Sequence, residues 1–163
     1  MPPRSSLLAA PLAALLLLLA PLPLRAQEPV PPTAAGPDLP ERQAIASYLV
    51  SALGEPYRRG ALGEGGYDCS GLVVSAYAAA GRQLPRLAAE QLRQGQPVEP
   101  GALRPGDLLF YRFNSRRPQR LHVVIYIGGG RAIHASPKHG EVREIEIAQS
   151  IWTRRLVATV SLL

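Results

Sequence analysis

The sequence has a single cysteine, Cys69, and a single lysine, Lys138, among its 163 residues. One cysteine excludes an internal disulfide, so the chain is not a disulfide-stapled scaffold. Such a lone thiol is either buried and inert or kept because it reacts. Aromatic residues make up only 6% of the chain, and no basic pattern interleaved with aromatics and no nucleic-acid motif is present. The sequence therefore does not predict a nucleic-acid partner.

No hydrophobic run is long enough to span a bilayer as an α-helix. The apolar stretch 7–20 is interrupted by Pro11, whereas a membrane span needs about 20 apolar residues. Because Arg4 precedes this stretch and small Ala26 follows it, residues 1–26 predict a secretory signal peptide, with an uncleaved anchor as the alternative. Residues 27–40 are rich in proline and predict an extended linker. We therefore expect one folded domain over 41–163 and export to a periplasm or the extracellular space.

Acidic residues are scarce relative to arginine. The whole chain carries a net charge of +6, and removal of 1–26 takes away two arginines and no acid, leaving 16 basic and 12 acidic residues, or +4. A basic balance suits an anionic partner such as wall polymer or lipid headgroups. One cluster of arginines has two interpretations: it attracts the carboxylates of an anionic partner, or it belongs to a solvated loop. The sequence leaves both open. The cluster consists of Arg112, Arg116, Arg117 and Arg120.

The apolar pattern changes period along the chain. Helical spacing predicts a first helix between Asp38, which forms a capping-box pattern with Glu41, and Gly54. A second helix follows Asp68, and a short third helix is expected over 87–93. Residues 54–67 hold five glycines and predict a loop. Period-two segments then predict five strands, and this order indicates an α+β domain with helices packed on an antiparallel sheet. The strands are 107–113, 121–127, 131–135, 141–147 and 155–161.

Cys69 falls in the first turn of the second helix, with Asp68 at its cap. The positive end of the helix dipole favours thiolate over thiol, and the free N–H groups there could hold an oxyanion. A base is still required, and the strand histidines His122 and His134 are the candidates. One cysteine and two histidines without a convincing carboxylate make an incomplete zinc set. We therefore expect neither a metal nor another cofactor.

The run Gly128-Gly129-Gly130 predicts the hairpin that positions these histidines. If its loop has three residues centred on Gly129, opposed residue numbers sum to 258, and His122 and His134 become diagonal neighbours on one face. A two-residue loop would instead place them on opposite faces. The first register makes His122 the base and His134 the group that orients it, whereas packing in the core is the plain alternative.

Four sequence blocks occur in a characteristic order: Asp68-Cys69-Ser70-Gly71-Leu72-Val73, the block 103–111 (LRPGDLLFY), the strand 122–128 (HVVIYIG) and Ile133-His134-Ala135. In this order and spacing they resemble the NlpC/P60 family of papain-like cell-wall cysteine peptidases. The resemblance implies a minimal papain-like α+β fold. It also implies an endopeptidase that cleaves peptidoglycan stem peptides between D-γ-glutamate and a diamino acid, usually meso-diaminopimelate, and we expect it to act as a monomer.

The same resemblance implies roles for individual residues. Cys69 matches the nucleophile, His122 the base and His134 the orienting residue. Tyr57, Asp68, Ser70 and Arg86 match positions that line the site or contact the stem peptide. The alternatives are a packing role for Tyr57 and a role as helix cap alone for Asp68. Leu87 and Ala88 replace hydroxyl residues usual in the family after the arginine, a change that bears on specificity. Three other readings stay open: a wall amidase, an acyltransferase with the same triad, and a non-catalytic wall-binding module.

Overall fold

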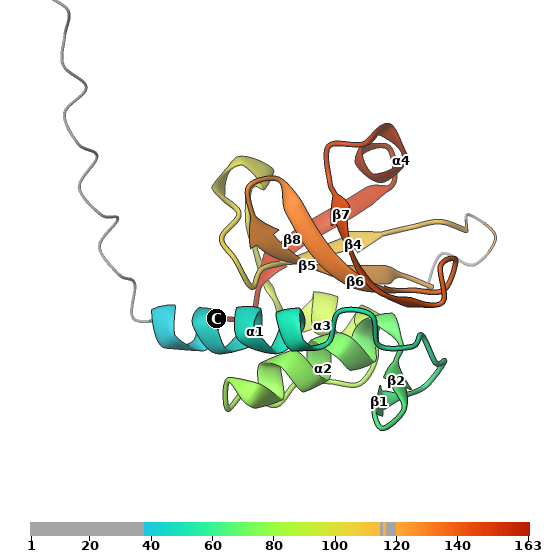
Figure 1. Cartoon of the computed structure of the whole chain (residues 1–163). Coiled ribbons are helices and arrows are strands. Elements are labelled where there is room, and N and C mark those ends of the chain that lie inside the picture. The colour runs from blue at the N-terminus through green and yellow to red at the C-terminus, as the bar shows by residue number, and fades with distance from the viewer. Residues whose placement is uncertain (1–37, 115, 117–119) are drawn as a thin grey trace, which may run out of the picture. The chain divides into compact units, whose positions relative to one another are not determined.

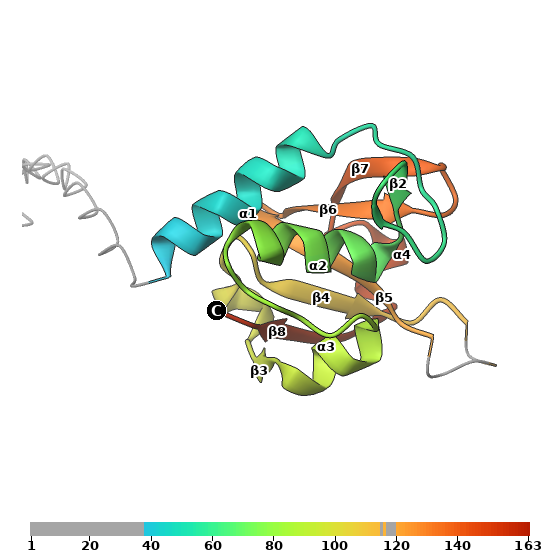
Figure 2. The same cartoon turned by 90° about the horizontal axis from the view of Figure 1, so that it is seen from below.

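The computed structural model describes residues 38–114, 116 and 120–163, so the expected signal peptide and most of the linker lie outside the described residues. Three helices, α1 (Leu39–Ser51), α2 (Cys69–Ala79) and α3 (Ala88–Gln94), precede most of the sheet. A fourth short helix, α4 (Ser150–Thr153), and a 3₁₀ turn at Pro100–Ala102 complete the helical elements of this part of the chain. The expected α+β class is confirmed, with α1 and α2 lying on one face of the sheet and α4 on the other (Figures 1 and 2).

The main sheet has six strands in the order β3-β8-β4-β5-β6-β7, and every pair is antiparallel. All five strands expected from the sequence are present, with ends within three residues of those expected. The pairing of two strands distant in sequence, β4 and β8, places β8 inside the sheet rather than at its edge. The strands are β3 (Gln96–Pro97), β4 (Leu108–Tyr111), β5 (His122–Gly128), β6 (Arg131–Ser136), β7 (Glu141–Glu146) and β8 (Leu156–Ser161).

Alternation along β5 and β6 separates two apolar layers. Val123 and Ile125 of β5 pack on the helices together with Ile133 of β6, and all three are almost fully buried. Val124 and Ala132 face the opposite side, where Trp152 of α4 covers them. Because successive strand residues point to opposite faces, His122 and His134 belong to the α4 side of the sheet. The sheet therefore carries the helices on one face and both histidines on the other.

Two local expectations are wrong. Residues 54–67 are not simply a loop, because β1 (Leu62–Gly63) and β2 (Gly66–Tyr67) form a small hairpin. Its turn is made possible by Gly65 and Gly66, whose φ angles of +70° and +136° favour glycine. The capping box at Asp38 is also absent, since its side chain caps no N–H and is engaged by arginines instead.

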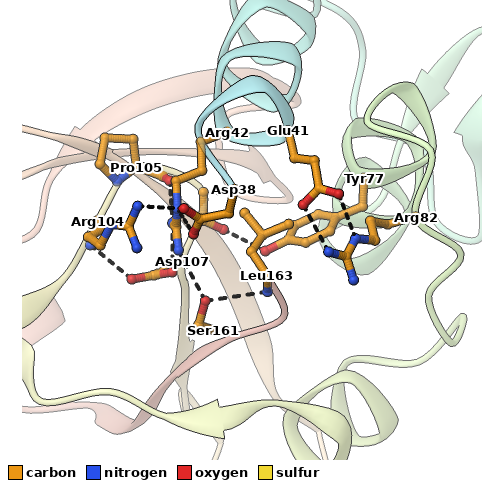
Figure 3. A network of polar contacts seen from close by, with 11 residues as sticks. Asp38, Glu41, Arg42, Tyr77, Arg82, Arg104, Pro105, Asp107, Ser161 and Leu163 are labelled. Carbon is orange, nitrogen blue, oxygen red and sulfur yellow. Dashed lines mark hydrogen bonds and ion pairs between the residues drawn. The ribbon is translucent and has the colours of Figure 1, made fainter. Parts of the chain in front are cut away.

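Those arginines belong to a network that ties α1 to the sheet (Figure 3). The guanidinium of Arg42, which is 5% exposed, donates to Asp38 at 2.7 Å and to Asp107 at 2.9 Å. It also donates to the carbonyl oxygen of Pro105 at 2.6 Å, while Tyr77 of α2 donates to the neighbouring Gly106 carbonyl. Hydrogen bonds from Arg104 and Arg42 lower the pKa of Asp38 to about 2. The network thus fixes both helices against the start of β4.

Candidate active site

Cys69 is the first residue of α2, and its position depends on the residues around the helix start. Asp68 has an extended backbone and accepts a 2.7 Å hydrogen bond from the Gly71 N–H, as an N-cap does. Gly71 is required there because a Cβ atom would collide with the carbonyl oxygen of Ala61. The expected capped helix start is therefore confirmed. The side chain of Cys69 is half-buried and packs against the core between α2 and the sheet.

Asp68 does more than cap the helix. Arg86 binds both of its carboxylate oxygens, at 3.0 and 2.6 Å, and also donates to the Ser70 hydroxyl at 3.0 Å. The Gly60 N–H adds a fourth donor at 2.8 Å. Burial raises the pKa of Asp68, but the bonds from Arg86, Gly71 and Gly60 outweigh it, so the pKa lies below its usual value. Asp68, Ser70 and Arg86, three residues expected to contact substrate, thus form one charged cluster beside Cys69.

Tyr57, the fourth such residue, lies on the same side of the cysteine. It is half-buried, packs against the core and pairs through its backbone with β2. Burial raises the pKa of its hydroxyl, as do the nearby Cys69 and Asp68, whereas Arg59 and Arg120 act in the opposite direction. The Tyr57 hydroxyl therefore lies close enough to the Cys69 thiol and to Arg120 for their charges to shift its pKa.

The expected register of the two histidines is confirmed, but the expected three-residue loop is wrong. Gly128 pairs with Arg131, which leaves a two-residue loop, and a register shift between Tyr126 and Gly128 restores the expected pairing. Ile125 pairs with Ile133 and Tyr126 with Ala132, and both pairs sum to 258. In this register Nε2 of His122 lies 2.7 Å from Nδ1 of His134. If His122 donates in this bond, its Nδ1 stays free to accept a proton, and His134 carries its own proton on Nε2. That Nε2 atom is buried without a hydrogen-bond partner among the described residues.

The Cys69 thiol lies against the backbone of β5, the strand that carries His122. The Val123 N–H stabilises the ionised form of Cys69, and so do the N–H groups of Ser70 and of Cys69 itself. Val123 directly follows His122, so the sulfur lies against the first residues of the strand that carries the base. The sulfur at the start of α2 therefore lies against the start of β5, whose His122 is bonded to His134 of β6.

The expected thiolate at neutral pH is contradicted by the burial of the group. Burial raises the pKa of the Cys69 thiol above its usual value, and the N–H groups around it only partly oppose this shift. Burial also lowers the pKa of His122 to about 4 and, with the charges of His122 and Arg143, that of His134 to about 3. Both effects favour an uncharged thiol beside an uncharged imidazole. The helix end thus assists ionisation without causing it in the resting site.

Trp152, the only tryptophan of the chain, covers the histidine pair and was not expected from the sequence. Its ring centroid lies 6.1 Å from that of His122 and 5.2 Å from that of His134, to which it is nearly perpendicular. Phe113 closes the same wall at 5.9 Å from His122 and 5.3 Å from Trp152. The segment 150–153 is too short for an apolar pattern to predict a helix there. A solitary tryptophan in a chain poor in aromatic residues was the only signal available.

This wall gives the first test. Replacing Trp152 with leucine opens the side of both imidazoles to water, so we expect kcat on a cleavable peptide to fall about ten- to a hundredfold because the base is no longer held in place. The pKa of His122 should rise toward 6.5, which moves the acid limb of the pH profile upward. Trp152→Phe, which retains a ring, is the matched control. An unchanged pH profile in a folded Trp152→Leu variant would contradict a positioning role.

A cavity of about 770 Å³ begins at this histidine pair. Its lining includes His122, His134 and Trp152 but not Cys69. Within the described ranges, no group of three or more histidine, cysteine, aspartate or glutamate side chains is placed to hold a metal ion. In the same residues no helix has the length and apolarity needed to cross a membrane.

A cysteine at a capped helix start, set against a sheet that carries a hydrogen-bonded histidine pair, defines the papain-like α+β class. The family model described as the NlpC/P60 family matches residues 54–161. The chain belongs to this family.

Relatives and solved structures agree with this assignment. The chain is 37% identical over 107 residues to the gamma-D-glutamyl-L-lysine dipeptidyl-peptidase of Bacillus subtilis, covering 65% of this chain and 36% of that protein. It is 38% identical over 114 residues to the murein DD-endopeptidase MepH of Escherichia coli, covering 67% and 41%. The chain thus spans less than half the length of these two curated relatives.

Among solved structures, an NlpC/P60 family protein from Bacillus cereus superposes with a TM-score of 0.69 at 27% identity, covering 75% of this chain and 40% of that one. RipD of Mycobacterium tuberculosis, described as a non-catalytic NlpC/p60 domain protein adapted to peptidoglycan binding, superposes with a TM-score of 0.62 at 27% identity, covering 76% and 98%. The fold therefore occurs both with and without catalysis, and the question of activity turns on the site residues.

Proposed function

We propose that this domain is a peptidoglycan endopeptidase that cleaves stem peptides at the bond between D-γ-glutamate and a diamino acid such as meso-diaminopimelate. The observation that carries the proposal is the placement of Cys69 at the start of α2 against the N–H of Val123, whose preceding residue in the strand, His122, is hydrogen-bonded to His134 at 2.7 Å. A binding module would have no need for a nucleophile, a base and an orienting group at one point. The names of two relatives, a γ-glutamyl-lysine peptidase and a murein endopeptidase, support the substrate class.

In the proposed reaction Nδ1 of His122 takes the proton from the Cys69 thiol as the sulfur attacks the scissile carbonyl carbon. The backbone N–H groups at the start of α2 stabilise the oxyanion, because they point to where its charge develops. His122 then returns the proton to the leaving amine, which breaks the peptide bond and leaves a thioester. Water hydrolyses the thioester with His122 again acting as base. His134 holds the imidazole in the required tautomer throughout.

The acyl side of the substrate is assigned to the residues on the Tyr57 side of the cysteine. Tyr57, Ser70 and the Asp68–Arg86 pair present a phenol, a hydroxyl and a bound ion pair next to the nucleophile. Such groups suit the polar backbone of a short peptide, and the ion pair also holds the start of α2 in place. We further propose that residues 1–26 direct export, that 27–40 form a linker, and that the domain acts as a monomer on the wall.

Digestion of purified peptidoglycan by the domain, followed by mass spectrometry of the released fragments, tests this function. Fragments that begin with a diamino acid and remnants that end in D-glutamate are the expected products. Loss of the whole stem at the sugar would instead identify an amidase, and joined stems an acyltransferase. Retention of the protein on intact, uncut peptidoglycan would place it with non-catalytic wall-binding domains.

The pH dependence of the reaction follows from the burial of the base. Protonated His122 cannot accept the thiol proton, and burial lowers the pKa of His122 to about 4. We therefore expect kcat/KM to hold from neutral pH down to about 4 and to fall about tenfold per pH unit below it. The measurement is kcat/KM between pH 3 and 8, with circular dichroism at each pH as the control for folding. An acid limb near 6.5 would mean that the imidazole is solvated.

A further inference from the structure

The cavity beside the histidine pair has more basic than acidic side chains in its lining. Arg143 of β7 pairs directly with His134 of β6, so its side chain projects from the face that carries the histidines. Lys138 follows β6, and Arg120 precedes β5. All three line the cavity. Two acids also line it, but one of them, Glu144, is bound to Arg131 at 3.1 Å.

Arg143 is the residue that most calls for a partner. It is half-buried on the sheet, yet among the residues that the structure describes no carboxylate lies within ion-pair distance of it. Its charge acts on the neighbouring His134 and lowers the pKa of that ring. A guanidinium held beside two uncharged histidines gains from an anionic ligand, because it presents donors in a fixed fork that matches a carboxylate.

The chemistry of peptide cleavage decides which part of a substrate would reach this cavity. His122 must stand next to the leaving nitrogen in order to protonate it, and His122 itself lines the cavity. The charged cluster of Asp68, Ser70 and Arg86 lies at the other side, around the start of α2. The cavity therefore extends from the position of the leaving amine, on the side away from the acyl group.

We propose that this cavity binds the leaving amino acid of the substrate, and that Arg143, with Lys138 and Arg120 at the rim, recognises a free carboxylate on it. The inference rests on the proposed function and adds the chemical class that the leaving group must have. Arg120 is the last of the four clustered arginines that precede β5 in the sequence. Of the four, only Arg120 has a role in the proposed binding, and this residue also lies near Tyr57. A diamino acid whose side-chain carboxylate is free would be preferred over the same residue with that carboxylate amidated.

Two synthetic stem peptides test the proposal. They are identical through the scissile bond and differ only in whether the leaving residue carries a free or an amidated carboxylate. Wild-type protein should cleave the free form with kcat/KM at least about tenfold higher, as expected for a charge-assisted hydrogen bond. Arg143→Gln should lose most of that preference, mainly through a higher KM for the free form, and should cleave the amidated form within about twofold of wild type.

Arg93→Gln is the matched control, because Arg93 lies on α3, is exposed and does not line the cavity. It should keep the wild-type preference. Equal cleavage of both peptides by wild-type protein would overturn the inference and leave the endopeptidase intact, whereas cleavage of neither would overturn both. An equal loss on both peptides in Arg143→Gln would also overturn it, since Arg143 would then act only through His134. Lys138→Gln, placed at the rim, should reduce the preference by a smaller factor.

Discussion

Cys69→Ala is expected to abolish the release of fragments from peptidoglycan, with a loss of kcat of at least about 10⁴-fold. The physical reason is that no other described side chain beside His122 can form the acyl intermediate. Two hydroxyls lie near the thiol: burial raises the pKa of Tyr57, and the Ser70 hydroxyl accepts a hydrogen bond from Arg86, so neither replaces the sulfur as a nucleophile. The assay is fragment release from purified wall material, followed by chromatography.

The substituted domain should fold normally, because alanine is smaller than cysteine and the helix start is held by Asp68 rather than by Cys69. An unchanged melting temperature is the required control. Wall binding by Cys69→Ala should persist, which separates loss of chemistry from loss of recognition. Cleavage close to the wild-type rate would refute the assignment of the nucleophile. Failure of wild-type protein to cleave would instead align the domain with RipD.

Arg42→Met is expected to lower the free energy of unfolding by about 3–5 kcal/mol. The substitution leaves Asp107, which is 1% exposed, without its guanidinium partner, and an uncompensated buried charge is costly. Because domains of this size are stable by only about 5–15 kcal/mol, such a loss removes a large share of the total. Urea unfolding followed by circular dichroism measures it.

Arg82→Met is the matched control within the same part of the molecule (Figure 3). Arg82 binds Glu41 at 2.9 Å, but both side chains are substantially exposed, so we expect a change of at most about 1 kcal/mol. Similar losses in the two variants would contradict the importance of burial. Replacing Arg42 and Asp107 together with apolar residues should recover much of the loss, because no buried charge then remains unpaired.

The sequence allowed the elements that carry the chemistry to be predicted, because each depends on a local rule. Asp68 indicates a capped helix start, and the glycine run 128–130 indicates the hairpin that carries both histidines, although the bulge before its two-residue loop was not predicted. These rules involve neighbours in the chain or across one turn. The same holds for the strands, whose alternation is visible within a few residues.

The rest depended on contacts between distant segments. Trp152 reaches the histidine pair only through the packing of α4 on the sheet, and nothing near it in sequence reports that contact. Asp38 matched a capping pattern, yet Arg104, 66 residues away, takes its carboxylate. The ionisation of Cys69 was also misjudged, since the helix end is readable from sequence and the burial that opposes it is not. Arg143 became a candidate only once β7 lay beside β6.

The place of β8 within the sheet has a consequence for how the domain is made. β8 is the last strand in chain order, yet it lies between β3 and β4 and pairs with both. Until it arrives during synthesis, β3 has no neighbour, and one edge of β4 is open. Such non-local pairing delays folding, because the entropy of closing a long loop must be met first. The nascent polypeptide should therefore stay unfolded until β8 emerges, and a folding rate that scarcely changes when β8 is deleted would argue otherwise.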